Sequence, residues 1–357
     1  MKAGAATLSV GSPYPERMKV LLLSAALLLP VASAQVTIPA TPPAAPSTPV
    51  APAVPVAPAA PASAPTLSLS APVGTGLELA TTTTSRTTIS NVQVTALPGS
   101  GVSAAELDAI RNSVPASLAG GEATTVSGNL FYRVTNRDAN GGVTLLTTTV
   151  QGVPGQPPVS LKITQTLGPN GAVGGLKFES DNPALQAVLA GLSAEKLREL
   201  AGQNGSNFAG IYGQPLVQGQ PRMQTAELDA TGMLSGMFSA FAGQADAQDL
   251  FGQVQSTPLR VTTTTTYGGL NAQGLHTFAS SGRYGPWQIK AGGGDFPGFD
   301  VELSEGQVSG TQTYRADGLP GPATQNLKMV MNMTMELEGV RLKLTMTIEQ
   351  TVAAKLR

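Results

Sequence analysis

Two stretches near the C-terminus alternate between apolar and polar residues, which is the period of a strand with one buried face. Suppose Glu338-Gly339 is a two-residue turn. Glu336 then faces Arg341, and each apolar side chain of one stretch faces one of the other. A slip of one residue would destroy both matches. The sequence therefore predicts a hairpin with one apolar face made by Met329, Met331, Met333, Met335, Leu337, Val340, Leu342, Leu344, Met346 and Ile348.

Threonine-rich runs separated by turn signals extend the β pattern over most of the chain. The runs 81–84, 147–149 and 262–266 favour strands because β-branched side chains fit a pleated surface. We expect a mainly β fold: an antiparallel, curved sheet or half-barrel with a few short helices packed on it. Besides the hairpin, the predicted strands are 76–94, 124–135, 143–150, 159–167, 176–179, 259–267, 275–284, 287–291, 299–302 and 307–315.

Three regions carry helical signals. Ser103 and Glu106 form a capping box, and the apolar stripe that follows stops at Pro115. Asn182-Pro183 is an N-cap with proline at the first helical position, and leucines follow at helical spacing. Residues 232–254 also have helical periodicity, although three glycines interrupt it. We expect a helical middle over residues 181–254.

The N-terminal region has the three parts of a secretory signal peptide. Met18-Lys19 supplies the charge, residues 20–31 are apolar, and Ala32-Ser33-Ala34 is a cleavage site. The apolar run is shorter than the ~20 residues that cross a bilayer, so we do not expect an integral membrane protein. We expect Met18 to be the true start and residues 1–34 to be an upstream extension plus a cleaved signal. The mature chain would then lie in the periplasm or at the cell surface.

A proline-rich segment follows the signal. Prolines recur within residues 35–73, much of the time every third residue, between Ala, Val, Ser and Thr. This composition favours a linker that is disordered or adopts polyproline II, joining the signal to a β-rich exported domain over 74–357. A weak internal echo of Thr-Gln-Thr before Asn-Gly or Asp-Gly suggests two related halves, 74–180 and 255–357, around the helical middle.

Composition limits the partners. The chain has no cysteine, 12% charged residues and a net charge of −1. Stability must therefore come from core burial rather than disulfides, and there is no basic patch typical of nucleic-acid binding. We expect a bacterial envelope protein, with a component of the wall, the surface layer or the membrane lipid as its partner, and no nucleic acid.

The search for catalytic chemistry gives only isolated candidates. His276 is the one histidine, and neither a nucleophile elbow nor a cluster of metal ligands accompanies it. The acidic pairs Asp295 with Asp300 and Glu302 with Glu305 are typical of solvated surface acids. We expect no enzyme activity, no catalytic residue, no metal and no cofactor.

The methionines are the feature with ligand-binding character, because their flexible side chains adapt to varied apolar shapes. Two interpretations stay open: an ordinary core, or a surface that binds a lipid-like molecule. The candidate ligand-binding residues are Met329, Met331, Met333, Met335, Leu342, Leu344 and Met346. The plan resembles that of bacterial carriers that hold lipid in a half-barrel, a likeness that transfers no residue roles. Our leading expectation is a non-enzymatic envelope protein with a structural or interaction role; the alternative is a periplasmic carrier or sensor of a hydrophobic small molecule.

Overall fold

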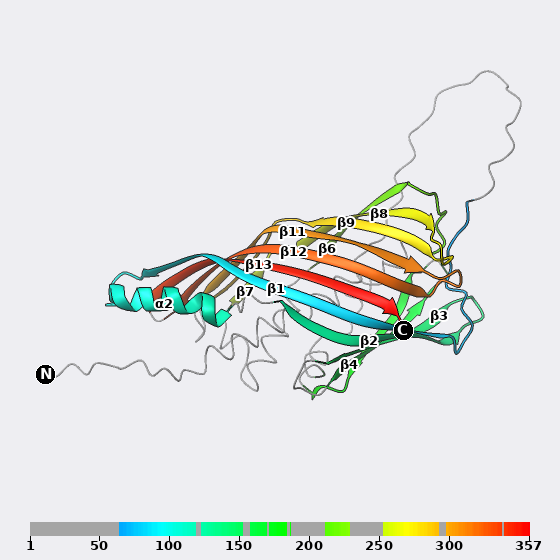
Figure 1. Ribbon diagram of the computed structural model, residues 1–357, viewed down its shortest axis with the longest axis horizontal. Coiled ribbons are helices and arrows are strands. Elements are labelled where there is room, and N and C mark those ends of the chain that lie inside the picture. The colour runs from blue at the N-terminus through cyan, green and yellow to red at the C-terminus, as the bar shows by residue number, and fades with distance from the viewer. Residues whose placement is uncertain are drawn as a thin grey trace, which may run out of the picture.

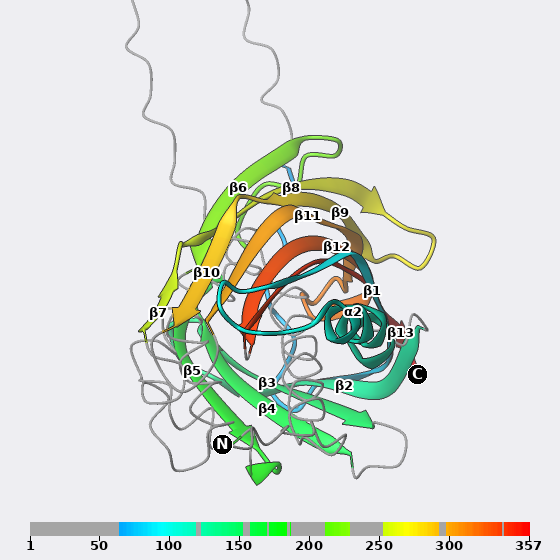
Figure 2. The same ribbon diagram turned by 90° about the vertical axis from the view of Figure 1, so that its left-hand side faces the viewer.

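The computed structural model of the protein describes residues 64–118, 123–152, 158–169, 171–183, 186, 211–228, 253–292, 298–337 and 339–357. These residues form one antiparallel sheet that curls strongly without closing into a barrel (Figures 1 and 2). The one helix whose full span is described is α2 (Ala104–Leu118). Pro183 and Gln186 are also helical, and the Gln186 N–H donates to the Asn182 carbonyl at 2.8 Å, as expected for a helix that begins at Asn182. The predicted fold class, a curved antiparallel sheet with little helix, is confirmed.

The two ends of the folded chain meet at the centre of the sheet. The strand order is β5-β4-β3-β2-β1-β13-β12-β11-β9-β8-β6, and β10 pairs with both β11 and β7. The first strand thus lies beside the last, whereas β5 and β6, consecutive along the chain, lie far apart in the order. The strands are β1 (Gly76–Ala96), β2 (Thr124–Arg137), β3 (Val143–Gly152), β4 (Val159–Leu167), β5 (Val173–Ser180), β6 (Pro221–Leu228), β7 (Gln253–Ser256), β8 (Leu259–Leu270), β9 (His276–Tyr284), β10 (Trp287–Gly292), β11 (Phe299–Tyr314), β12 (Pro320–Leu337) and β13 (Val340–Leu356).

The predicted C-terminal hairpin is confirmed in its register. β12 and β13 pair Leu337 with Val340, and the pairing continues in step along the alternating face to Met329 opposite Ile348. Gly339 has a φ of 87°, the left-handed conformation that a tight hairpin turn requires and glycine adopts without strain. The alternation of apolar residues was therefore sufficient to define this pairing.

Three elements differ from the predictions. The two strands predicted over 299–302 and 307–315 are one strand, β11, with a bulge between Leu303 and Glu305 that absorbs the break in alternation. Strand β6 was not predicted. β7 occupies the last residues of the helical stretch expected over 232–254; the rest of that stretch before 253, like most of 184–210, lies outside the described residues.

Helix α2 begins as predicted. The Ser103 N–H donates to Glu106 Oε2 at 2.8 Å, and the Glu106 N–H donates back to Ser103 Oγ at 3.3 Å, which completes the capping box. The helix continues beyond Pro115 to Leu118. Proline removes only the bond to the carbonyl of Arg111, and Arg111 is exposed, so water can replace the lost partner. No described helix is long and apolar enough to cross a membrane.

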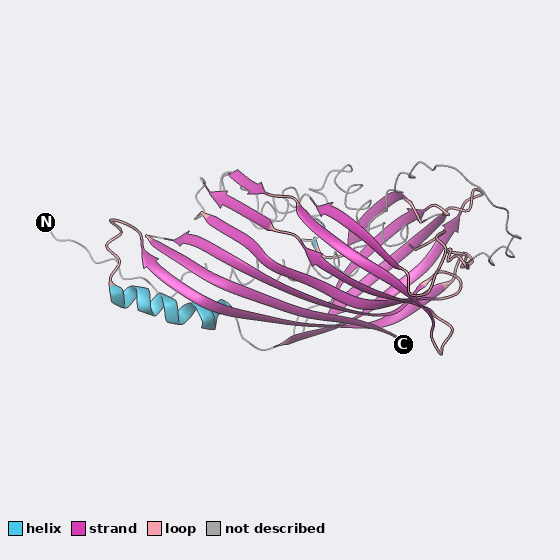
Figure 3. Cartoon of the chain, turned by 90° about the horizontal axis from the view of Figure 1, so that it is seen from above, coloured by secondary structure: helices cyan, strands magenta, loops and turns pink. Residues whose placement is uncertain are grey.

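The concave face of the sheet holds two apolar clusters at opposite ends of the strands. Figure 3 shows α2 at one end of the sheet. The methionine cluster lies at this end, because Leu107 and Ile110 of α2 pack against it. The aromatic cluster lies near the β8–β9 and β11–β12 turns. The core of the methionine cluster is Val94, Leu259, Val261, Leu303, Leu327, Met329, Met331, Met335, Val340, Leu342, Leu344, Met346 and Ile348. The core of the aromatic cluster is Leu67, Leu69, Ala71, Val134, Val143, Leu145, Leu167, Ile211, Tyr212, Leu216, Phe278, Tyr314 and Leu319.

Residues 64–73 belong to the folded unit, although they fall inside the range expected to be linker. Leu67 and Ala71 are buried in the aromatic cluster. The Arg137 guanidinium donates to the carbonyl oxygens of Leu69 and Ala71 at 3.0 and 2.9 Å. The Leu216 N–H donates to the carbonyl of Pro65 at 2.8 Å. The N-terminal segment is thus tied to the interior of one end of the sheet.

Glycines allow the strands to bend sharply where the sheet curls. At Gly310 in β11 an added Cβ would collide with the carbonyl oxygen of Thr324 on the neighbouring strand. At Gly282 in β9 it would lie 2.7 Å from Thr263 Cγ2. Both glycines therefore allow a close approach between neighbouring strands that a side chain would prevent.

Candidate functional site: a polar cavity on the concave face

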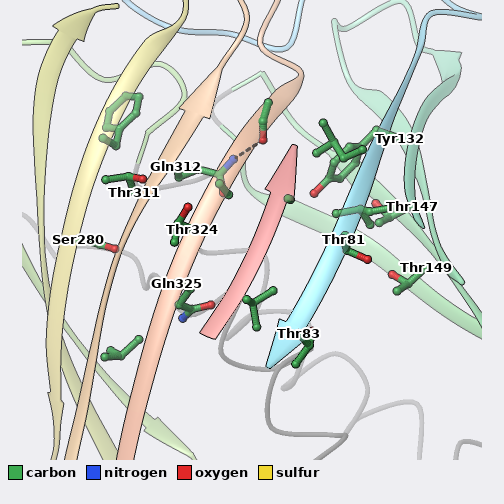
Figure 4. Close-up of a pocket in the computed structure, with 18 of the residues that line it drawn as sticks. Thr81, Thr83, Tyr132, Thr147, Thr149, Ser280, Thr311, Gln312, Thr324 and Gln325 are labelled. Carbon is green, nitrogen blue, oxygen red and sulfur yellow. Dashed lines mark hydrogen bonds between the residues drawn. The ribbon is translucent and has the colours of Figure 1, made fainter. Parts of the chain in front are cut away.

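A cavity of about 180 Å³ lies on the concave face between the two apolar clusters (Figure 4). Along β9, Phe278 belongs to the aromatic cluster, Tyr284 packs on the methionine cluster, and both line the cavity with Ser280 between them. The other walls come from β1, β2, β3, β4, β8, β11, β12 and β13 and from Ile211. The polar side chains labelled in Figure 4 include Thr81, Thr83, Thr147, Thr149, Ser280, Gln312 and Gln325.

Strand register brings these polar residues together. On neighbouring strands Thr265 pairs with Ser280, Ser280 with Gly310, and Gly310 with Gln325. The row continues from Gln325 to Val352 and from Val352 to Thr83. Gly310, in the middle of this row, allows β11 to approach the Thr324 carbonyl of β12 closely. A band of hydroxyls and amides therefore crosses the sheet around a hollow.

The cavity is electrically neutral. Its described lining contains threonine, serine, glutamine, tyrosine and apolar residues, without Asp, Glu, Lys, Arg or His. The ionisable groups are the phenols of Tyr132 and Tyr284. Burial raises the pKa of Tyr132 far above its ordinary value and that of Tyr284 to about 12, so both stay protonated. A charged ligand would lose its hydration here and find no counter-ion. An uncharged polar ligand needs no counter-ion and can bond to the hydroxyls and amides of the walls.

One wall of the cavity carries an unsatisfied hydroxyl. Thr263 in β8 is 4% exposed, and its Oγ1 has no hydrogen-bond partner among the described residues. A buried polar atom without a partner costs about 1–3 kcal/mol. Gln350 on β13, which does not line the cavity, is also buried, and its Oε1 has no hydrogen-bond partner among the described residues. The Thr263 hydroxyl is closed to solvent, so a ligand in the cavity would pair with it only after the neighbouring side chains move.

The seven predicted ligand-binding residues all lie on the concave face, at the methionine end. Six are buried, and Met333 is partly buried against the same cluster. Leu107 and Ile110 of α2 pack against this cluster, as does Trp287. None of the seven lines the cavity, although they continue the same face along β12 and β13. The structure therefore joins them to one another and places them beside the polar band.

The isolated catalytic candidates have structural partners. The His276 Nδ1 lies 2.9 Å from the Tyr267 hydroxyl at the aromatic end, and burial lowers its pKa. Asp300 accepts a hydrogen bond from Gln288 Nε2 at 2.9 Å, and Glu305 accepts one from Gln307 Nε2 at the same distance. Asp295 lies outside the described residues. The described chain contains no group of three acidic or histidine side chains placed to hold a metal ion.

Sequence reasoning did not single out the polar cavity. Its threonines come from the runs that predicted strands, and only alternate members point inward. Thr81 and Thr83 line the cavity, for example, whereas Thr84 does not. The signal was therefore present as polar residues at every second position, where a buried face should be apolar. These polar residues form one cavity only because β1 pairs with β13, which lies more than two hundred residues away along the chain.

Comparison with known proteins provides no relative from which to transfer a function. No family model, curated protein or solved structure matches this chain. The interpretation of the cavity therefore depends on its shape, its neutrality and the chemistry of its walls.

Proposed function

We propose that the protein is a non-enzymatic carrier or sensor, exported to the periplasm or cell surface, that holds an uncharged amphipathic molecule on the concave face of its sheet. The observation that carries this proposal is a neutral cavity lined by hydroxyls and amides that directly adjoins an apolar, methionine-rich face. The polar head of the ligand would bind in the cavity, and its apolar part would lie along the methionine cluster.

The size of the cavity supports this division of the ligand. About 180 Å³ is less than the 300–1,000 Å³ that usually encloses a drug-sized molecule. It has room for a small head group with several hydroxyls but not for an acyl chain. Met331 and Met333 lie further along the same face, and methionine side chains can rearrange around a flexible chain at low cost.

Other functional classes make less use of this arrangement. A hydrolase needs a nucleophile with a base or a pair of carboxylates, and the described lining supplies neither. A purely structural envelope protein, the leading expectation from the sequence, gains nothing from the unpaired buried hydroxyl of Thr263. That role stays a proposal for the opposite face of the sheet, which is considered below.

A titration with two lipids of different charge tests the proposal. Trp287, the single tryptophan, packs on the methionine cluster, so its fluorescence reports on ligand there. We expect monoolein, which is uncharged, to change this fluorescence and to bind at least about tenfold more tightly than oleate, because the carboxylate must be desolvated. Equal binding of the two, or a response to neither, would contradict the proposal.

A matched pair of threonine variants links this binding to the cavity. Thr263→Val keeps the side-chain shape and removes the unpaired hydroxyl, so we expect unchanged or higher stability together with weaker monoolein binding. Thr266→Val, on the same strand outside the cavity lining, is the control and should bind like the wild type. Met333→Gln tests the apolar part, because Met333 is only partly buried and its substitution disturbs folding less.

A further inference from the structure

A second, larger hollow crosses the convex face of the sheet. This groove has a volume of about 830 Å³ and is lined by residues of β1, β13, β12, β11, β9 and β8. Most of its lining side chains alternate with those that point into the concave cavity: Thr84 with Thr83, and Thr264 with Thr263 and Thr265. The two linings share Ser281 and Val308, but the cations Arg86, Lys328 and Arg283 line the groove alone.

One row of groove residues carries charge. The strand register pairs Arg86 with Glu349, Glu349 with Lys328, Lys328 with Gln307, and Gln307 with Arg283. All five side chains are exposed and line the groove. Three cations and one carboxylate thus form a line that runs across the strands, in a chain whose net charge is −1.

The cations in this row are regularly spaced. Arg86, Lys328 and Arg283 lie on every second strand of the order β1-β13-β12-β11-β9. Adjacent strands are about 4.8 Å apart, so successive cations are roughly 10 Å apart. Within the described residues, Lys328 and Arg283 form no ion pair or side-chain hydrogen bond, and the one carboxylate of the row, Glu349, lies beside Lys328 but not beside Arg283. The row therefore keeps an excess of positive charge available to a ligand.

A second row, two residues further along each strand, offers hydroxyls and amides. It runs through paired neighbours from Thr84 on β1 to Thr264 on β8. Within it, Thr351 Oγ1 donates to Asn326 Oδ1 at 2.9 Å, which leaves the Asn326 amide nitrogen to donate outward. The residues of this row are Thr84, Thr351, Asn326, Ser309, Ser281 and Thr264.

We propose that this groove binds an anionic glycan, a polyuronate chain in which the carboxylate of every second sugar faces the row of cations. The spaced cations would contact the carboxylates, and the adjacent row would bond the sugar hydroxyls. A single-stranded nucleic acid fits less well, because the described lining has no aromatic side chain on which bases could stack. This proposal does not depend on the cavity, since no residue of the charged row lines the cavity.

The test measures binding of the mature chain to defined polymers by fluorescence anisotropy at low salt. The probes are labelled polygalacturonate as the anionic glycan, dextran as a neutral glycan and polyglutamate as an acidic peptide. We expect polygalacturonate to bind about tenfold or more tightly than either of the others, because only it uses both rows. Equal binding of polyglutamate would show simple anion attraction, and equal binding of dextran would show that the cations have no part; either result overturns the proposal.

Two sets of variants assign the binding to the groove. The double substitution Arg283→Gln with Lys328→Gln should weaken polygalacturonate binding about tenfold. Lys343→Gln, an exposed lysine of β13 outside the groove, should leave it unchanged. Asn326→Leu should weaken polygalacturonate but not polyglutamate. Because these side chains are exposed, thermal unfolding should stay near that of the wild type, so a loss of binding reports on the surface itself. Unchanged affinity in the double variant would contradict the proposal.

Discussion

The two apolar clusters on the concave face are similarly buried, but they are assembled in different ways. Most of the methionine cluster comes from one hairpin, in which Met329 and Ile348 are directly paired. The aromatic cluster joins Leu67, Tyr212 and Tyr314, which come from three distant parts of the chain. The first cluster follows from local strand pairing, whereas the second forms only when the whole sheet has curled.

The side chains in the two clusters also differ. The Tyr314 ring meets Tyr212 at 6.0 Å and Phe278 at 5.5 Å between centroids, both edge to face. Such contacts depend on defined ring positions. The methionines have three flexible torsions and fill space without a fixed geometry. One end of the concave face is therefore specified by the shapes of its rings, whereas the side chains at the other end can rearrange, as the proposed ligand requires.

The largest expected effect is at the aromatic end. Tyr314 is 4% exposed, and Tyr314→Ala should lower the free energy of unfolding by about 3–5 kcal/mol, because it removes both ring contacts and leaves a cavity. Tyr314→Phe keeps the ring and should cost less than about 1 kcal/mol. Urea denaturation measures both. A loss below about 1 kcal/mol for the alanine variant would break the distinction between the two ends.

A smaller effect is expected at the methionine end. Met329 is 2% exposed, yet Met329→Leu should cost less than about 1.5 kcal/mol, because the volume is kept and the neighbouring side chains can adjust. Met329→Ala, which loses volume, is the comparison and should cost about 2–4 kcal/mol. The same denaturation experiment applies. A leucine variant as unstable as the alanine variant would mean that this cluster is as rigid as the aromatic one.

The smallest effect concerns pH. His276, the only histidine, lies at the aromatic end, and burial lowers its pKa in the folded state below the ordinary 6.5. The unfolded chain therefore binds the proton more tightly. The contribution of His276 to stability is complete above the unfolded pKa and declines as the pH falls towards the folded pKa. Denaturation midpoints measured between about pH 7.5 and pH 5 should fall less for His276→Gln than for the wild type. If the midpoints of both proteins fall equally with pH, His276 does not contribute to the pH dependence of stability.

Local patterns in the sequence were enough for most of the sheet. The alternation of Met329–Met335 with Leu342–Ile348 defined a register that the structure reproduces in every pair. The predicted bounds 159–167 coincide with β4 (Val159–Leu167). These elements are determined by contacts between residues that are close along the chain, so periodicity and turn chemistry describe them well.

The rest of the structure depends on contacts across the whole chain. No local pattern predicts that β1 pairs with β13. Nor does one predict that residues from 64–73 pack in the aromatic cluster. The polar cavity exists because Thr83 and Gln325 come from strands that meet only in the folded sheet. The bulge in β11 interrupted the alternation, and so one strand was predicted as two.

The relation between the two predicted halves stays a prediction. The structure places the central glutamines of both Thr-Gln-Thr copies, Gln165 in β4 and Gln312 in β11, on the inner side of the sheet. Gln165 is buried beside the aromatic cluster residues of β3 and β4, and Gln312 lines the cavity. A common placement of two glutamines in a threonine-rich sheet is too small a similarity to establish a duplication.

The most direct test of the central claim is native mass spectrometry of the protein, purified without detergent from cells that produce it and compared with the Thr263→Val variant. We predict that the wild type carries an uncharged lipid-like molecule at one copy per chain, released by solvent extraction, and that the variant carries much less of it. A wild-type protein that is free of ligand, or a charged lipid bound equally by both proteins, would contradict the assignment of the concave face as a ligand-binding site.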